Sequence, residues 1–209
     1  MIRFSLINVQ QSGAKLSDFA NDEALCKFFG SDEEYVNDSD RKRSRLGKIR
    51  VVELLLDAGV SRDKLMSIQK SEKGKWYLSD SEFDFNVAHS HDFVACAVSD
   101  DGMVGVDIEK TRLLDWGTYR DCFTRDEFTG ILGSRKPEQY FFNLWTKKES
   151  LLKAWGDGLS IDLADAIIEG NEGHIRGTAK RGYFYVIPVE GYACVVCSTV
   201  ANQDVRMIG

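Results

Sequence analysis

The sequence predicts an α/β protein made of two similar halves, each with a small sheet and helices. Strand-like segments of alternating hydrophobicity are mixed with segments of helical periodicity along the 209 residues. In addition, Phe93–Ser99 (FVACAVS) resembles Tyr192–Ser198 (YACVVCS), and each follows a turn and another predicted strand. Buried strands often look alike by chance, so this similarity alone does not establish a duplication.

No low-complexity linker interrupts the chain. We therefore expect residues 1–103 and residues 104–209 to pack as one compact body. A cleft between two such halves is a common place for a ligand.

The first half is predicted to alternate strands with two helices. Apolar residues recur at helical intervals at 17–29 and again in a helix that ends near residue 58. The acidic stretch 31–40 reads as the connection between them. Ala88–Asp92 is predicted to be a loop between two strands. The strands are expected at 2–9, 65–69, 76–78, 83–87 and 93–98.

The second half is predicted to begin with a strand at 104–108. Thr124 and Glu127 match a helix capping box. A longer helix is expected from Pro137, which suits a first turn, to Trp155, with Gly156 or Gly158 at its end. Further strands are expected at about 165–168, 174–178, 183–188 and 192–199.

Composition narrows the class of protein. The chain is 43% hydrophobic and 29% charged, as is ordinary for a soluble globular protein. A net charge of −6 argues against a general nucleic-acid binder. No apolar run approaches the roughly 18 residues of a membrane span, and the start reads as a strand and not as a signal peptide.

The five cysteines fit reduced thiols in a cytoplasmic protein, because their number is odd and their settings are mostly apolar. Cys194 and Cys197 have the spacing of a redox or zinc pair. Side chains three residues apart on a strand point to opposite faces, however, so we do not expect a chelate there.

Asp107 and Glu109 are the first candidate site residues. On a strand they share one face with Gly105, which we expect to leave room for a ligand. The alternating residues point to the core: Val104, Val106 and Ile108. Two adjacent carboxylates repel each other, and a divalent cation would compensate. The alternative is a pair of acids on a solvated strand face.

Glu149 is the third candidate acid, and Lys148 and Lys153 flank it on a predicted helix. Glu149 and Lys153 lie one turn apart and can form an ion pair. A surface pair of this kind would contribute little. The aromatic flanks, Trp145 and Trp155, favour a functional role instead.

Several basic or polar residues could bind phosphate. His89 and Ser90 suit phosphate better than zinc, because no cysteine lies near them in the sequence. Gly74–Lys75 is a turn with a cation. Six basic residues fall within ten positions, and a solvated helix face explains most of them. They are Arg41, Lys42, Arg43, Arg45, Lys48 and Arg50.

Taken in order, these motifs resemble the Sfp-type 4′-phosphopantetheinyl transferases along more than half of the chain. No single motif is specific, but the ordered set is. The matching segments are Arg43 with Gly47, Gly74–Lys75, Phe85–Ser90, Val104–Glu109, and Trp145–Ala154 with Gly156 and Gly158–Leu159.

The resemblance implies the pseudo-two-fold fold of that family, with coenzyme A in the cleft between the halves. It implies transfer of the 4′-phosphopantetheine arm to a serine of an apo acyl or peptidyl carrier protein, which releases adenosine 3′,5′-bisphosphate. It also implies magnesium, which manganese could replace, held by Asp107, Glu109 and Glu149. An internally duplicated chain would have less need to dimerise, so we expect a monomer.

The implied coenzyme A contacts are Arg43, Lys75, His89, Ser90, Lys148 and Lys153. The implied catalytic residues are Asp107, Glu149 and Lys153. The carrier serine would attack the β-phosphorus, and Glu149 is the candidate base, directly or through water. That duty competes with holding the cation.

Three features depart from the family pattern. Its loop usually reads Ser-His-Ser-Gly, whereas Ala88 and His91 replace the first serine and the glycine here. Trp76 stands where proline is common. Acidic residues replace the usual basic segment near residues 20–40, where Lys27 and Arg41 could substitute.

Two other functions compete with the transferase. One is a non-catalytic module with the same fold that binds coenzyme A or a carrier protein. The other is a magnesium-dependent phosphodiesterase that releases phosphopantetheine to water.

Overall fold

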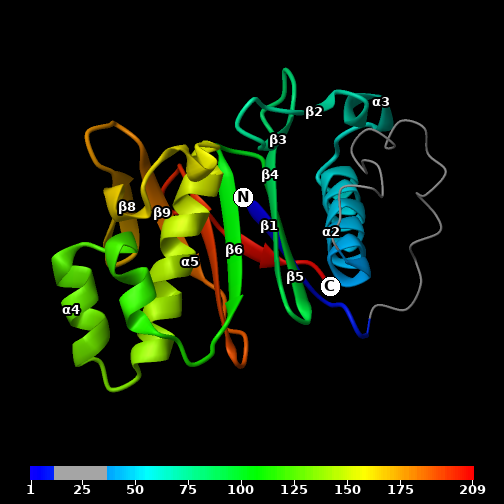
Figure 1. Ribbon diagram of the computed structural model, residues 1–209. Coiled ribbons are helices and arrows are strands. Elements are labelled where there is room, and N and C mark those ends of the chain that lie inside the picture. The colour runs from blue at the N-terminus through cyan, green and yellow to red at the C-terminus, as the bar shows by residue number, and fades with distance from the viewer. Residues whose placement is uncertain (12–36) are drawn as a thin grey trace.

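Two sheets lie face to face between helices in the computed structural model, which describes residues 1–11 and 37–209 (Figure 1). The helix predicted at 17–29 falls outside the described residues, as do Lys27 and Cys26. The mixed α/β class predicted from the sequence is confirmed. Along the described chain, no helix has both the length and the apolar character needed to cross a membrane.

The first sheet has the strand order β11-β1-β5-β4, and helix α2 covers its outer face (Figure 1). Strand β5 pairs antiparallel with both β1 and β4, while β11 pairs parallel with β1. The bounds are β1 Ile2–Asn8, α2 Asp38–Asp57, β4 Asp84–Ser90, β5 Phe93–Ser99 and β11 Val205–Met207. Between α2 and β4 come α3 (Arg62–Leu65) and a hairpin of β2 (Ile68–Lys70) and β3 (Trp76–Leu78).

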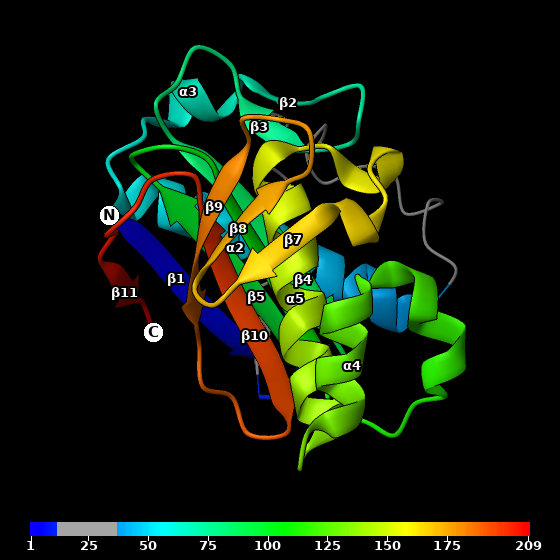
Figure 2. The same ribbon diagram turned by 90° about the vertical axis from the view of Figure 1, so that its left-hand side faces the viewer.

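The second sheet is antiparallel, with the order β6-β10-β9-β8-β7, and helix α5 packs across it (Figure 2). Its strands are β6 Val104–Lys110, β7 Ala166–Glu169, β8 Glu172–Ile175, β9 Arg181–Val186 and β10 Tyr192–Ser198. The helices are α4 (Arg125–Gly133) and α5 (Pro137–Trp155). Short 3₁₀ turns η2, η3 and η4 span Trp116–Cys122, Gly158–Ser160 and Leu163–Asp165.

The two similar segments of the sequence become β5 and β10, and both lie inside a sheet against a helix. Strand β11 comes from the second half yet joins the first sheet. Because the two sheets do not separate fully into residues 1–103 and 104–209, the division of the chain into these two halves stays a prediction. The inner faces of the sheets share one core, formed in part by Phe4, Ala95, Val106, Ile108 and Cys194.

Cys194 and Cys197 lie on opposite faces of β10, as the strand alternation predicts. Cys194 belongs to the core between the sheets, and Cys197 packs in the core under α5. Both thiols are buried and free. Burial raises the pKa of each, so neither is a ready metal ligand.

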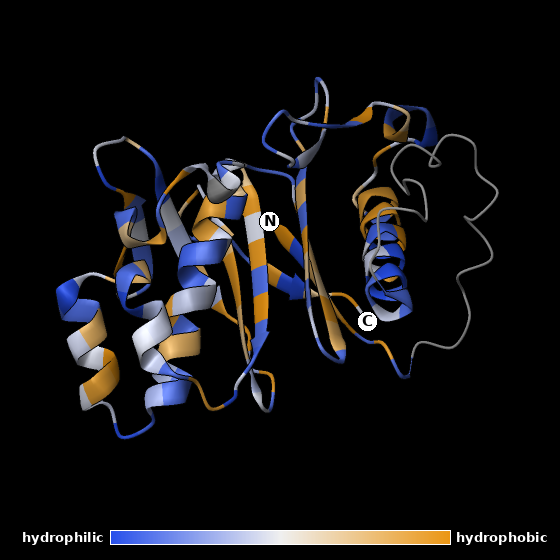
Figure 3. Cartoon of the chain, in the orientation of Figure 1, coloured by the Kyte–Doolittle hydropathy of each residue, from blue (hydrophilic) through white to orange (hydrophobic). Residues whose placement is uncertain are grey.

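Helix α5 begins and ends where the sequence predicts. Pro137 occupies its first turn, and Gly156 caps its end with a φ of 69°, in the left-handed region that favours glycine. The predicted capping box of α4 is also present, with Thr124 and Glu127 bonding each other's backbone. Figure 3 shows hydrophobic residues concentrated on the strands and mixed with polar ones on the helices.

Two sequence predictions about local structure are wrong. The segment Ala88–Asp92 is not a loop, because β4 continues to Ser90 and pairs with β5 along its whole length. Only a two-residue turn remains, in which His91 has a φ of 49°. The strand predicted at 65–69 begins at Ile68 instead, because Ser61 caps the short helix α3 that ends at Leu65.

Strands β4 and β6 join the two sheets through side chains. Strand β6 is the edge of its sheet within the described residues, and side chains of β4 accept hydrogen bonds from its outward N–H groups. Asp84 accepts from Val104 N at 2.7 Å, and Asn86 accepts from Val106 N at 3.0 Å. Ser90 Oγ accepts from Lys110 N at 3.2 Å. These bonds satisfy the edge of β6 and fix the register between the halves.

This pattern steps by two residues along each strand, and Ala88 interrupts it. Its buried methyl group lies where the repeat would place an acceptor for Ile108 N. A serine hydroxyl at position 88 would fill that place, which gives a structural reason for the serine usual in the family.

We predict that Ala88→Ser stabilises the protein, because it adds one buried hydrogen bond between the halves. The expected gain in the free energy of unfolding is about 0.5–1.5 kcal/mol, measured by urea denaturation. Ala88→Cys is the matched control, since it adds similar bulk with a poor hydrogen-bonding atom. Equal loss of stability in both variants would show that the interruption is not an unfilled hydrogen-bonding position.

Candidate active site

Close packing of α5 on β6 brings the helical and strand candidates together. A Cβ atom on Gly105 would lie 2.0 Å from Ser150 O and 2.4 Å from Ala154 N. Only glycine therefore lets the helix backbone approach this strand. The prediction that Gly105 leaves room for a ligand is wrong, because α5 fills that space. The approach instead places Glu149 and Lys153 beside the acidic face of β6.

Asp107 and Lys153 form the central ion pair. Lys153 Nζ lies 2.6 Å from Asp107 Oδ1, and the Asp107 side chain is only 6% exposed. Burial alone would lower the pKa of Lys153, but the carboxylates of Asp107, Glu149 and Glu109 outweigh it and raise that pKa. The other oxygen, Asp107 Oδ2, is buried and has no hydrogen-bond partner within the described part of the chain.

Glu109 and Glu149 flank Asp107, and each responds to its charge. Burial raises the pKa of Glu109, and the negative charge of Asp107 raises it further. Burial likewise raises the pKa of Glu149; Lys153 opposes this shift and Asp107 adds to it. Asp107 is thus the carboxylate that both glutamates share, and the group carries more negative charge than one lysine balances.

A hard divalent cation suits this donor set. Carboxylate oxygens are the ligands that magnesium prefers. Asp107 Oδ2 is a buried acceptor without a hydrogen-bond donor among the described residues, and a cation bound there would reduce the repulsion among the three carboxylates. Across residues 1–11 and 37–209, no three His, Cys, Asp or Glu side chains are gathered closely enough to hold a metal ion. The three carboxylates are thus the right kind of ligand for magnesium, but they would have to move closer together to bind one ion.

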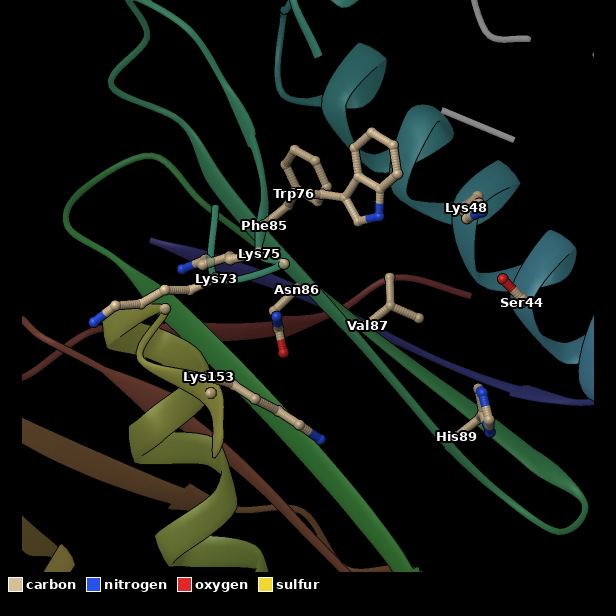
Figure 4. Close-up of a pocket in the computed structure, with 13 residues that line it drawn as sticks. Ser44, Lys48, Lys73, Lys75, Trp76, Phe85, Asn86, Val87, His89 and Lys153 are labelled. Carbon is tan, nitrogen blue, oxygen red and sulfur yellow. The ribbon is translucent and has the colours of Figure 1, made fainter. Parts of the chain in front are cut away.

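A cleft of about 340 Å³ opens beside the ion pair, in the size range of small-molecule sites. Figure 4 shows Lys153 reaching into it from α5, with Ser44 and Lys48 of α2 across from it. Lys73, Gly74 and Trp76 of the β2–β3 hairpin also line the cleft. Figure 4 shows His89 on β4, on the opposite side of the cleft from Lys73. The lysines make the cleft suited to an anion.

Arg43 of α2 lies near His89, the residue of β4 farthest along the strand that lines the cleft. Partial loss of hydration and the positive charge of Arg43 lower the pKa of His89. Arg43 pairs with Asp40 and donates to His91 O at 3.2 Å. Its buried Nε has no hydrogen-bond partner within the described residues.

The ammonium group of Lys75 makes three hydrogen bonds within the protein. It donates to Asp84 Oδ2 at 2.6 Å, Ala154 O at 2.8 Å and Val104 O at 3.2 Å, which accounts for its three protons. Lys75 thus joins β4, β6 and the end of α5. Its side chain is 11% exposed and lines the cleft, and these three bonds occupy all of its donors in this structure. The predicted contact of Lys75 with coenzyme A stays a prediction.

Lys148 lies away from the cleft. Its fully buried ammonium pairs with Glu127 at 2.9 Å and donates to Ala166 O at 2.6 Å and Leu163 O at 3.1 Å. The structure does not bring it together with the other candidates. Position 148 faces the side of α5 that packs on α4, whereas Glu149 and Lys153 face β6.

Comparison with known proteins places the chain in a family. Residues 103–197 match the family described as the 4′-phosphopantetheinyl transferase superfamily. The 4′-phosphopantetheinyl transferase gsp of Aneurinibacillus migulanus is 32% identical over 175 residues, covering 80% of this chain and 73% of that protein. The 4′-phosphopantetheinyl transferase Sfp of Bacillus subtilis strain 168 is 33% identical over 186 residues, covering 83% and 82%. This chain belongs to the 4′-phosphopantetheinyl transferase superfamily.

The resemblance to the Sfp type stated from the motifs is thereby confirmed, and so is the expectation of an enzyme. A more distant relative is the L-aminoadipate-semialdehyde dehydrogenase-phosphopantetheinyl transferase of Xenopus laevis. It is 30% identical over 141 residues, covering 59% of this chain and 46% of that protein.

Asp157 and Lys73 of this transferase are two further residues at the cleft that no motif in the sequence predicted. Asp157 is 3% exposed and pairs with Lys180 at 2.5 Å and Lys73 at 2.9 Å. Burial alone would raise the pKa of Asp157, but hydrogen bonds from Lys180 and Lys73 outweigh it and lower that pKa. Asp157 thus ties the β2–β3 hairpin to the end of α5. The one feature of the sequence that could have indicated this role is the position of Asp157 between Gly156 and Gly158, directly after the predicted helix.

We predict that Lys153→Met destabilises the transferase by about 3 kcal/mol, because it leaves the buried Asp107 carboxylate beside two glutamates without its cation. Urea denaturation in the presence of a chelator gives the free energy of unfolding. The double variant Asp107→Asn with Lys153→Met should recover most of the loss, since the unpaired charge is gone. Losses that simply add in the double variant would contradict the pairing.

Proposed function

We propose that this enzyme transfers the 4′-phosphopantetheine arm of coenzyme A to a serine of an apo acyl or peptidyl carrier protein. The second product would be adenosine 3′,5′-bisphosphate. The observation that carries the proposal is the Asp107–Lys153 pair, with Glu109 and Glu149 beside it, at the edge of a cationic cleft. The names of the relatives supply the transferred group.

The cleft has positive charge to bind a pyrophosphate and an aromatic surface to contact a nucleotide base. Lys153, Lys73 and Lys48 bring positive charge to its walls, and His89 offers a neutral hydrogen-bonding ring. Trp76 presents an aromatic surface near Lys48 and Lys70. We propose that coenzyme A lies here, with Lys153 and His89 against its phosphates and Arg43 near the His89 end.

Asp107, Glu109 and Glu149 would hold a magnesium ion, which manganese could replace. When bound, the ion neutralises charge on the pyrophosphate oxygens. Lys153 would orient the Asp107 carboxylate and add positive charge where the leaving phosphate develops negative charge. Glu149 is the candidate base for the proton of the carrier serine, directly or through water. This duty competes with holding the cation, because a carboxylate bound to a cation is a weaker base.

Two further expectations belong to this proposal. Residues 112–136 and 157–180 flank the carboxylates and are proposed to receive the carrier protein. Leu113 and Leu132, which are 86% and 57% exposed, offer apolar contacts there. We also propose that the enzyme acts as a cytoplasmic monomer, in keeping with its buried free thiols.

The direct test is the intact mass of apo carrier proteins incubated with the enzyme, coenzyme A and magnesium. We predict an increase of roughly 340 Da, the mass of the covalent phosphopantetheine group. Asp107→Ala should lower the initial rate by at least about 100-fold, because it removes the central carboxylate and the partner of Lys153. A chelator should have a comparable effect on the wild type.

Val186→Ala is a matched control in the same half, because Val186 is 52% exposed on β9 and lies outside the proposed carrier-binding surface and the cleft lining, so this variant should keep the wild-type rate. Labelling by Asp107→Ala at the wild-type rate would refute the assignment of the site. A wild type that binds coenzyme A but labels no carrier would support the non-catalytic module. Release of free phosphopantetheine without any carrier would support the phosphodiesterase.

A further inference from the structure

Ser90 makes contacts that differ from those of a phosphate-binding residue. It is the last residue of β4 and is 8% exposed, with its side chain turned toward β6. The cleft described above is lined by His89 of the same strand but not by Ser90. Its hydroxyl therefore faces the carboxylates of β6 and not the cationic walls.

Two neighbouring residues of β6 orient this hydroxyl. Ser90 Oγ accepts from Lys110 N at 3.2 Å and donates to Glu109 Oε2 at 3.0 Å. The hydroxyl has a single proton and two possible acceptors, Glu109 Oε2 and His91 Nδ1, which lies 3.3 Å away. The carboxylate is the stronger acceptor of the two. The proton is thus directed to Glu109, and none is left for a phosphate oxygen.

The anchoring of Glu109 parallels that of Asp107. One oxygen of Asp107 is held by Lys153 from α5, and one oxygen of Glu109 is held by Ser90 from β4. Each strand carboxylate is therefore fixed by a side chain from a different element. In each case the second oxygen remains for another ligand, and Asp107 Oδ2 is the buried, unpartnered example.

We propose that Ser90 is a positioning residue that orients Glu109 toward a divalent cation, and that it does not contact coenzyme A. This inference rests on the proposed function, because it takes Glu109 as a cation ligand. Groups that hydrogen-bond metal ligands are known to tune affinity, and their loss typically weakens metal binding by about 10–100-fold.

The test compares Ser90→Ala with Ser90→Thr, which keeps the hydroxyl. Binding of Mn²⁺ is measured by electron paramagnetic resonance, and binding of coenzyme A by calorimetry in the presence of a chelator. We expect Ser90→Ala to weaken Mn²⁺ binding by about tenfold or more and to leave metal-free coenzyme A affinity within about twofold. Ser90→Thr should restore Mn²⁺ affinity.

Ser44→Ala is the matched control, since Ser44 lines the cleft from α2 and should not affect Mn²⁺ affinity. If Ser90→Ala does not fold, Ser90→Cys keeps the bulk with a poor donor and gives the same readout. Unchanged Mn²⁺ affinity with metal-free coenzyme A binding weakened about tenfold or more would overturn the inference and return Ser90 to the phosphate. A wild type that labels no carrier would instead refute the proposed function.

Discussion

Side-chain hydrogen bonds between β4 and β6 hold the two sheets together and so determine where the cleft lies. Each strand is the edge of its own sheet, and Asp84, Asn86 and Ser90 of β4 satisfy N–H groups of β6. Lys75 adds a second connection by bonding β4, β6 and α5 at once. Because these bonds fix the two sheets relative to each other, the cleft has walls from both halves: α2 and β4 on one side, and α5 on the other.

The same packing creates an electrostatic cost at the site. The absence of a side chain at Gly105 lets α5 press against β6, which partly buries three carboxylates near one another. Lys153 offsets part of the repulsion by pairing with Asp107. The remaining negative charge and the unpartnered Asp107 Oδ2 are features that stability alone does not favour. Such local conflicts are expected where function needs them, and here they favour a bound cation.

The sequence was informative where a signal is local. Pro137 and Gly156 marked both ends of α5, and the Thr124 capping box marked the start of α4, because caps depend on residues three or four positions apart. Alternation along 104–110 likewise assigned the apolar residues of β6 to the core.

Partners distant in the chain could not be predicted in this way. Lys75 looked like a phosphate ligand, but one of its acceptors, Ala154 O, is 79 residues away. Lys148 was predicted, like Lys153, to contact coenzyme A, but the fold places Ala166 O and Glu127 around its ammonium group. Gly105 showed a missing side chain without showing whether a ligand or a helix fills the space. In each case the decisive contact forms only when the elements pack.

An anomalous difference map from a crystal grown with Mn²⁺ and coenzyme A tests the proposed cation site most directly. We predict one strong manganese peak bounded by Asp107, Glu109 and Glu149, next to the pyrophosphate, with the nucleotide in the cleft between α2 and α5. Coenzyme A bound elsewhere, or a manganese peak that contacts none of these three carboxylates, would contradict it.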